Sequence, residues 1–217
     1  VVLIAGGAFL FRPGQSREEP ASVERMVFPL PDRPSIAVLP FDNMSGDAEQ
    51  EYFVDGMTED LITDLSKISG LFVIARNSSF SYKGKPVKVN QVAEDLGVRY
   101  VLEGSVRRAG DTVRINAQLI DATTGGHLWA ERYDGTLENV FALQDQVTGK
   151  IVAALAVTLT GDEKANRGRS ETHNPQAYDA FLQGWEKYRR GTPDGLRESI
   201  TYLEQAVARD PAYARAY

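Results

Sequence analysis

Cysteine is absent from the 217 residues, and histidine occurs only twice. Without cysteine the chain has no disulfide, no thiolate metal ligand and no cysteine nucleophile. His127 and His173 have no partner at the spacing of a zinc site, so we predict neither a metal nor a cofactor. Lysine and arginine number 24 against 30 aspartates and glutamates, a net charge of −6. The basic excess that binds nucleic-acid backbones is therefore missing, and we expect no nucleic-acid partner for these residues.

Residues 1–11 are uncharged and mostly apolar, but they are too few to span a bilayer, which takes about 20 residues. Three interpretations are open: a buried strand or helix, the core of a signal peptide, or the end of a transmembrane helix. The pair Gly6-Gly7 suits a membrane helix better than a soluble one, where each glycine costs about 1 kcal/mol. We therefore favour the end of a transmembrane helix that tethers the protein to a membrane.

Residues 12–34 contain five of the ten prolines, and proline interrupts both helices and sheet ladders. We expect an extended or disordered linker, in which Met26-Val27-Phe28 is an apolar patch suited to docking on the following domain. The charges near its start are mixed and lack the positive excess of a cytoplasmic flank. This pattern predicts a bacterial inner-membrane protein with residues 12–217 on the periplasmic side.

Residues 35–160 show the apolar patterning of a small α/β domain. Residues 36–41 predict a buried strand, and residues 71–75 predict a second one. Between them, residues 53–68 repeat apolar side chains every three or four positions, which predicts an amphipathic helix. The strand–helix–strand order implies a parallel pair with a right-handed crossover. A polar loop at residues 76–79 is expected to follow.

The rest of this domain is expected to begin with a short helix that has Asn90 as its N-cap and ends at Gly97. Three strand-like runs joined by close turns predict an antiparallel meander. A second long helix is expected to cover the apolar face that Trp129 and Tyr133 share. The ranges are 100–107, 113–119 and 127–134 for the strands and 137–159 for the helix. The predicted fold class is α/β, with a small mixed sheet and covering helices.

The C-terminal part of the chain has a different character. Residues 161–173 are charged and contain glycine, so we predict a linker. Residues 174–217 predict two helices separated by residues 189–195, an α-helical hairpin.

Motifs for catalysis are missing. Gly149-Lys150 resembles the end of a phosphate-binding loop, but Ile151 follows where serine or threonine is required. Ser105 is not in a nucleophile elbow, because Glu103 stands where that motif needs glycine. We therefore predict no catalytic residue and no enzymatic activity in this chain.

Four aspartates surround the first predicted helix. Paired carboxylates can bind a metal or act as acid and base, but such residues more often cap a helix and favour its positive N-terminus. We predict the capping role for Asp42, Asp47, Asp55 and Asp60.

Polar loops follow the first two predicted strands. In a parallel strand–helix–strand unit, ligands bind beyond the carboxyl ends of the strands. The two loops are therefore a candidate ligand or partner site, in which Arg76 would bind an anionic group or a partner's carboxylate. The alternative, which we favour, is that Arg76 pairs with Asp42 or another nearby acid and only closes the loop. The candidate residues are Asp42, Asn43, Ser45, Arg76, Asn77 and Ser78.

Two family resemblances follow from these motifs. Residues 35–160 resemble the TolB amino-terminal-like domain through Ile36–Phe41, Tyr52–Leu61, Leu102–Arg107 and His127–Asp134. Residues 174–217 resemble a truncated tetratricopeptide repeat through Leu203, Ala206 and Pro211, with Ser199 in place of the usual alanine. One such repeat cannot bury its own apolar face, so we expect further repeats in the natural protein.

The TolB resemblance implies a module of bacterial envelope and signalling proteins, often located between a transmembrane helix and tetratricopeptide repeats. Such modules commonly follow a class III adenylate or guanylate cyclase domain or a winged-helix DNA-binding domain. We therefore predict a non-catalytic, envelope-facing binding or scaffold module of a membrane-bound signalling protein, with protein partners. The alternative is the C-terminal regulatory part of such a cyclase, with catalysis in an upstream domain.

Overall fold

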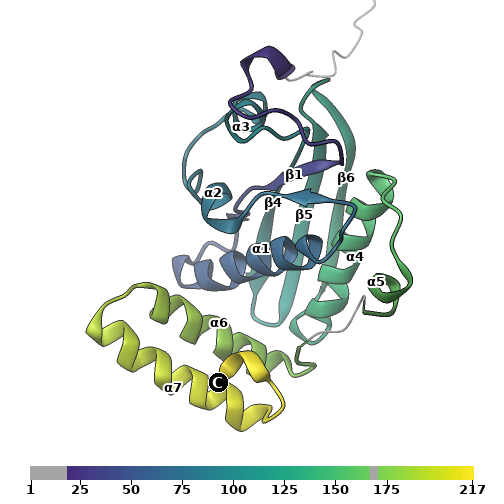
Figure 1. The fold of residues 1–217 in the computed structure, drawn as a ribbon. Coiled ribbons are helices and arrows are strands. Elements are labelled where there is room, and N and C mark those ends of the chain that lie inside the picture. The colour runs from purple at the N-terminus through teal and green to yellow at the C-terminus, as the bar shows by residue number, and fades with distance from the viewer. Residues whose placement is uncertain (1–18, 167–170) are drawn as a thin grey trace, which may run out of the picture.

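A six-stranded mixed sheet with helices on both faces is joined to a helical hairpin (Figure 1). The computed structural model describes residues 19–166 and 171–217, so the expected membrane segment at 1–11 lies outside it. The strands are β1 (Ser35–Val38), β2 (Asp42–Asn43), β3 (Phe72–Val73), β4 (Tyr100–Ala109), β5 (Thr112–Asp121) and β6 (Gly126–Thr136). The α-helices are α1 (Glu51–Ser66), α2 (Arg76–Phe80), α3 (Val89–Leu96), α4 (Val140–Ala154), α5 (Gly161–Asn166), α6 (Pro175–Arg189) and α7 (Pro193–Arg209).

The sheet combines a parallel start with an antiparallel meander, in the strand order β3-β1-β4-β5-β6. Strand β1 is parallel to both β3 and β4, and the short β2 extends the parallel pairing along β4. Strands β4, β5 and β6 are antiparallel neighbours joined by tight turns. The predicted fold class is confirmed, including the helical hairpin at the C-terminal end.

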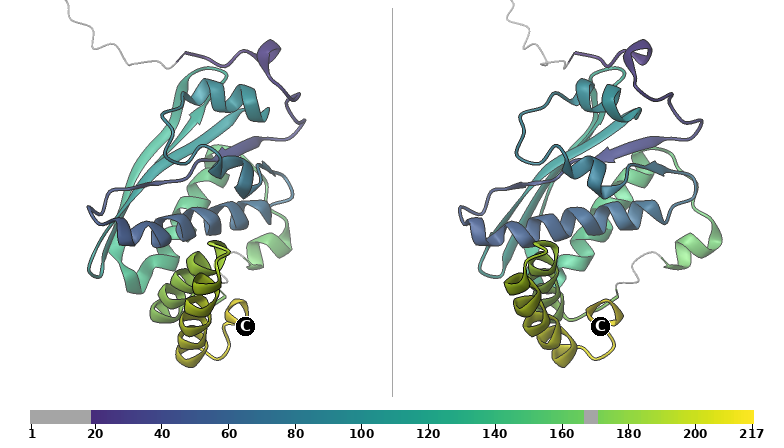
Figure 2. Two further views of the ribbon diagram at one scale, coloured as in Figure 1. Left: turned by 90° about the vertical axis from the view of Figure 1, so that its left-hand side faces the viewer. Right: turned by 60° about the vertical axis from the view of Figure 1, so that its left-hand side comes forward.

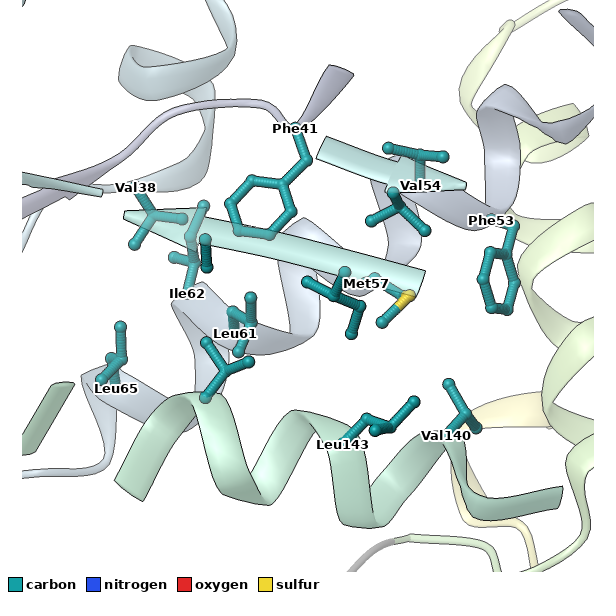
Figure 3. Close-up of a cluster of buried hydrophobic side chains, with 14 of the residues drawn as sticks. Val38, Phe41, Phe53, Val54, Met57, Leu61, Ile62, Leu65, Val140 and Leu143 are labelled. Carbon is teal, nitrogen blue, oxygen red and sulfur yellow. The ribbon is translucent and has the colours of Figure 1, made fainter. Parts of the chain in front are cut away.

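One face of the sheet carries the main core, which α1 and α4 cover (Figure 3). Buried side chains of α1, such as Phe53, Met57 and Leu61, face Val140 and Leu143 of α4. Tyr133 is buried in the same core and Trp129 packs against it, as predicted for this face of β6. The core is continuous with the buried face of α6, so the hairpin and the sheet share one hydrophobic cluster.

A smaller core lies on the other face of the sheet, under α3. Val92 and Ala93 of α3 pack there against Val101 and Ile120. The helix ends as predicted at Gly97, which adopts φ 64°. Asn90 is not its N-cap, however: the helix begins at Val89 after Lys88, and the side-chain Oδ1 of Asn90 accepts from Gln91 N instead.

The segment before β1 is bound to the domain more closely than a linker prediction implies. Within the described part, 19–34, Ala21 N donates to Ala122 O and Val27 N donates to Glu94 O. Met26 packs against the smaller core, whereas Val27 and Phe28 are exposed. Proline excludes regular ladders here, but isolated backbone hydrogen bonds still hold the segment in place. Figure 2 shows it at the opposite end of the molecule from the hairpin.

Three other local predictions need correction. Residues 76–80 form the short helix α2 rather than a loop, and α5 lies within the predicted linker. Helix α4 ends at Ala154, although apolar spacing continues to Leu159. Ala156 adopts φ 51°, Ala156 N donates to Ala153 O, and Val157 N donates to Val152 O. This is a Schellman motif, which ends the helix by bonding its last carbonyls.

The hairpin of α6 and α7 is capped at both N-termini. Asn174 accepts hydrogen bonds from Gln176 N and Ala177 N, and Thr192 accepts one from Gly195 N. A proline at the first helical position follows each cap, where its missing N–H costs nothing. Within the part of the chain that the structure describes, no helix combines the length and apolar character that a membrane span requires.

Candidate functional site

The first predicted loop is built into the sheet. Asp42 and Asn43 form β2, and Met44 N donates to Val106 O at 2.8 Å. The Asn43 side chain accepts from Ser45 N at 3.0 Å and donates to Asp47 O at 2.9 Å. Ser45 Oγ accepts from Arg108 N at 3.0 Å. Asn43 and Ser45 thus shape the loop and anchor it to β4.

Arg76, from the second predicted loop, binds the middle of α1. Its Nε donates to Glu59 Oε2 at 2.7 Å, and its guanidinium lies 3.7 Å from the centre of the Phe80 ring. Burial, followed by the charge of Arg189, lowers the pKa of this guanidinium. The nearby acid is therefore Glu59, on the crossover helix, rather than Asp42. Asn77 contacts Arg76, and Ser78 N donates to Ala75 O within α2.

Asp42 and Asn43 line an open groove of about 950 Å³. It lies on the same face of the sheet as α3, over the part of that face that α3 does not cover. Its floor consists of polar cross-strand pairs. Asn116 Nδ2 donates to Ser105 Oγ at 3.1 Å, and Gln118 Nε2 donates to Glu103 Oε1. The loop that includes Lys83 and Lys85 forms one wall. Arg76, Asn77 and Ser78 do not line this groove, so the structure separates the two halves of the predicted site.

A second feature is the contact between α1 and the hairpin, which we call the junction. Glu59 binds both sides of it. Its carboxylate accepts from Arg76 Nε on the α/β side, and from Arg189 Nη1 at 3.0 Å and Trp185 Nε1 at 3.3 Å on α6. The Glu59 side chain is 16% exposed, so these are charge-assisted hydrogen bonds in a partly desolvated setting.

Asp60 makes the second polar contact of the junction. Tyr178 OH donates to Asp60 Oδ2 at 2.6 Å, and Arg215 Nη1 donates to Asp60 Oδ1 at 3.0 Å. Burial raises the pKa of the Asp60 carboxyl, although the charge of Arg215 and the Tyr178 hydroxyl oppose this shift. Arg215 also lies over the Phe181 ring, 4.8 Å from its centre.

Asp179 makes the third contact, this time from α6 toward the sheet. It accepts from Tyr52 OH at 2.8 Å and from Arg108 Nη1 at 2.5 Å. The Arg108 guanidinium lies 4.8 Å from the centre of the Phe53 ring. Three carboxylates, each bonded to at least two donors, therefore hold the hairpin on the α/β domain.

The capping role predicted for the four aspartates holds for one of them. Asp47 accepts from Glu49 N at 2.9 Å at the start of the short turn before α1. Asp55 pairs with Lys83, and Asp60 belongs to the junction, because both lie inside α1 rather than at its N-terminus. Asp42 lies in β2. Across residues 19–166 and 171–217, no three histidine or acidic side chains are grouped so that they could hold a metal ion.

Sequence reasoning named Asp60 and Arg76 in other roles but did not predict the junction. The hydrogen bonds from Tyr52, Asp60 and Glu59 to the hairpin join residues more than 115 positions apart. No local spacing could have revealed such pairs.

Comparisons with known proteins show the family of the chain. Residues 32–150 match the model of the second domain of HilA/YgeH-like transcriptional regulators, and the chain belongs to this family. It is also 55% identical over 203 residues to a protein of Rhizobium meliloti (strain 1021) named "Putative adenylate cyclase 3". That match covers 94% of the chain but only 35% of the relative, so the chain spans about a third of the relative's length.

Solved structures show partial likenesses. TolB from Acinetobacter baumannii is 19% identical with a TM-score of 0.44, covering 62% of this chain and 31% of TolB. The LpoB C-terminal domain from Escherichia coli is 16% identical with a TM-score of 0.38, covering 47% of this chain and 82% of that domain.

Proposed function

We propose that this chain is a non-catalytic binding and scaffold module of a membrane-bound bacterial signalling protein, one that mediates protein–protein interaction or signal sensing. The observation that carries the proposal is the junction. Glu59, Asp60 and Asp179 use their carboxylates to hold the hairpin to the sheet domain, which gives the two parts one fixed arrangement. A fixed arrangement suits a module that presents a surface or relays its state to an attached domain.

A second candidate is more specific: the chain is the regulatory part of a class III adenylate or guanylate cyclase, with catalysis in a domain upstream. The 55% identity to a relative named as an adenylate cyclase, in which this region fills about a third of the length, supports it. The family description supports a regulatory role in general, since it places this type of domain second in transcriptional regulators. We interpret the hairpin as a tetratricopeptide repeat because Leu203, Ala206 and Pro211 stand at the spacing of that repeat. Gly184 lies directly against Leu203 and Ser199 of α7, which lets the two helices pack closely.

We place partner binding at the groove beside Asp42 and Asn43, where polar side chains are open to a ligand. We assign helix α2 a structural role, because Arg76 is bound by Glu59 and lies over the Phe80 ring. Arg76→Ala and Arg76→Gln should lower the stability of the fold. When equal amounts of folded protein are compared, neither variant should change the activity of the domain to which this chain is attached. A changed output in fully stable variants would return Arg76 to the binding site.

The non-catalytic claim is tested directly by incubating the purified chain with ATP and with GTP. We expect no turnover and no cyclic nucleotide. Turnover above a buffer control would overturn the claim.

The regulatory claim is tested in the Rhizobium meliloti relative, with its matching region replaced by this chain and cyclic AMP measured in cells. The groove variant Asn116→Lys should change the output, whereas Gln91→Lys, an equal charge change at an exposed position of α3, should not. Regulation by this module would be refuted if cyclic AMP levels were equal in four proteins: the relative that carries this chain, its two variants, and the relative from which the region has been deleted.

The proposed location rests on the mixed charges after the apolar segment 1–11. Alkaline phosphatase fused after residue 34 should be active, because that enzyme matures only in the periplasm. An inactive fusion that is present at normal levels would reverse the orientation.

A further inference from the structure

Three large apolar side chains are exposed within one short stretch of the segment before β1. Val23, Val27 and Phe28 are 53%, 66% and 59% exposed, and we call these residues the N-terminal patch. Nine large apolar side chains are exposed in the described part of the chain, and three of them lie within the six positions 23–28. Single exposed apolar residues are normal, but a concentration of them marks a surface that binds a protein or a membrane.

Polar contacts hold this segment on α3. In addition to the backbone hydrogen bond from Val27 N to Glu94 O, the Glu94 carboxylate accepts from Ser22 N at 2.8 Å. Arg25 forms an ion pair with the same carboxylate, also at 2.8 Å. The segment is therefore part of the folded domain, and the exposure of the patch is a property of the fold.

Other apolar side chains of the same segment are directed inward. Ala21 is buried, and Met26 packs against the smaller core under α3. The backbone of Phe28 lies directly on Gly97 at the end of α3, where an added Cβ would come within 2.7 Å of Phe28 O. The Phe28 ring nevertheless stays outside, and the N-terminal patch belongs to neither core of the described structure. Its apolar surface is therefore available to something outside the domain.

The N-terminal patch is close in sequence to the apolar segment 1–11. Only residues 12–22 separate the two, and these eleven residues span at most about 40 Å when fully extended. Figures 1 and 2 show the segment that carries the patch at the end of the sheet domain opposite the hairpin. With residues 1–11 in the membrane, as proposed above, this end is held next to the lipid. A short tether gives the lipid surface a high effective concentration there, so that even a weak apolar contact is populated.

We propose that the N-terminal patch inserts into the lipid–water interface of the membrane, with its side chains among the acyl chains just below the headgroups. The driving force is the removal of apolar surface from water, so the contact requires no particular headgroup. The inference rests on the proposed membrane tether and adds to it a fixed orientation of the domain. Because three carboxylates hold the hairpin on the sheet domain, this orientation extends to the hairpin, which would point away from the membrane.

The test uses the full chain in phosphatidylcholine vesicles, and the absence of cysteine permits labelling at single introduced positions. Glu24→Cys lies within the patch and leaves its three apolar side chains in place. Labelled there with the environment-sensitive dye NBD, the chain should emit at shorter wavelength, and nitroxide-bearing lipids should quench the emission. Glu204→Cys, at an exposed position of α7, is the matched control and should keep the spectrum of the dye in water. Ala8→Cys reports separately on the tether.

Two pairs of substitutions, made in the chain labelled at residue 24, assign the contact to the patch. Val27→Ser with Phe28→Ser should abolish the wavelength shift, and the urea midpoint should not fall, because both side chains are exposed. Leu196→Ser with Ile200→Ser removes similarly exposed apolar side chains from the hairpin and should leave the shift unchanged. Adding phosphatidylglycerol to the vesicles should not be necessary for the contact.

Lipid contact at residue 8 without contact at residue 24 would overturn the proposal and leave the tether intact, whereas contact at neither position would overturn both. Contact at residue 24 alone would support the patch and refute the tether. The proposal also fails if contact at residue 24 survives the loss of Val27 and Phe28, or if it requires phosphatidylglycerol. Self-association that depends on the patch, seen by light scattering without any lipid contact, would assign the patch to a second copy of the chain instead.

Discussion

Removing the Asp179 carboxylate should weaken the attachment of the hairpin to the sheet domain. Asp179→Ala leaves the Arg108 guanidinium, whose side chain is only 14% exposed, without its ion-pair partner. What remains to Arg108 is the Tyr52 hydroxyl at 3.2 Å, a long contact to Gly110 O at 3.4 Å and the Phe53 ring. Because water reaches this guanidinium poorly, its charge is left without adequate compensation.

The magnitude follows from the burial of the pair. Breaking a buried ion pair by removing one partner costs about 3–5 kcal/mol, whereas an exposed pair contributes about 0–1 kcal/mol. Asp179 and Arg108 retain 19% and 14% side-chain exposure, so we expect the lower end, about 3 kcal/mol. Asp179→Asn keeps an oxygen that can accept from Tyr52 and should cost about half as much.

The assay is urea unfolding of the chain, followed by circular dichroism and by tryptophan fluorescence. Trp185 stacks between Phe181 and Tyr188 in the hairpin, whereas Trp129 packs against the core of the sheet domain. All variants are therefore compared in a Trp129→Phe background, in which the emission comes from Trp185 and reports on the hairpin. We expect the fluorescence transition of Asp179→Ala to precede the loss of helical signal. The matched control is Asp194→Ala, which removes an exposed acid of the same hairpin paired with Arg197, and should cost less than about 1 kcal/mol.

A double-mutant cycle decides whether the pair itself is responsible. Arg108→Met removes the charge while covering Phe53, so the double variant contains no unpaired buried charge. We expect a coupling free energy of at least about 2 kcal/mol between the two positions. A cost below about 1 kcal/mol for Asp179→Ala, or additive single changes, would refute the reasoning that desolvated ion pairs hold the junction.

Other substitutions test different parts of the structure. Hydrogen bonds from Ser69 N and Thr160 N lower the pKa of Glu163 to about 2, so its stabilising contribution should be present above about pH 4.5 and lost as the pH falls toward 2. Glu163→Gln should therefore flatten the acid limb of the stability curve, whereas Glu204→Gln at an exposed position of α7 should leave it unchanged. Thr58→Val should cost about 1–3 kcal/mol in urea unfolding, because Thr58 Oγ1 accepts from a buried backbone N–H at 3.2 Å; an unchanged midpoint would contradict this. Gly56→Ala should destabilise the chain and shift Trp185 emission, because a methyl group there would overlap Leu182, and an increase in melting temperature would show that α6 yields without cost.

Local patterns were enough to predict most of the sheet domain. The apolar repeat of residues 53–68 located α1, whose buried positions include Phe53, Met57, Leu61 and Leu65. Alternation and close turns located the meander, and Gly97 ended α3 as expected. These features succeed because burial imposes its period on consecutive residues, and because few residues other than glycine adopt positive φ readily.

Where helices begin and end was less predictable. Leu159 continues the apolar spacing of α4, but the helix stops at Ala154 because its last carbonyls are bonded in a Schellman motif with Ala156 at positive φ. Likewise, a polar stretch starting at Arg76 forms α2, since Arg76 is held by Glu59 on α1. In both cases contacts outside the simple pattern decided the local conformation.

By itself, the sequence determined the fold class, the apolar faces and the hairpin, all of which depend on neighbours within one or two turns of chain. It also contained every charge of the junction, but it did not show which charges meet. Asp60 meets Arg215 across 155 positions, and Asp179 meets Arg108 across 71. Only the tertiary structure decides such pairs, because the cost of burying a charge is offset solely by a partner that folding brings within hydrogen-bonding distance.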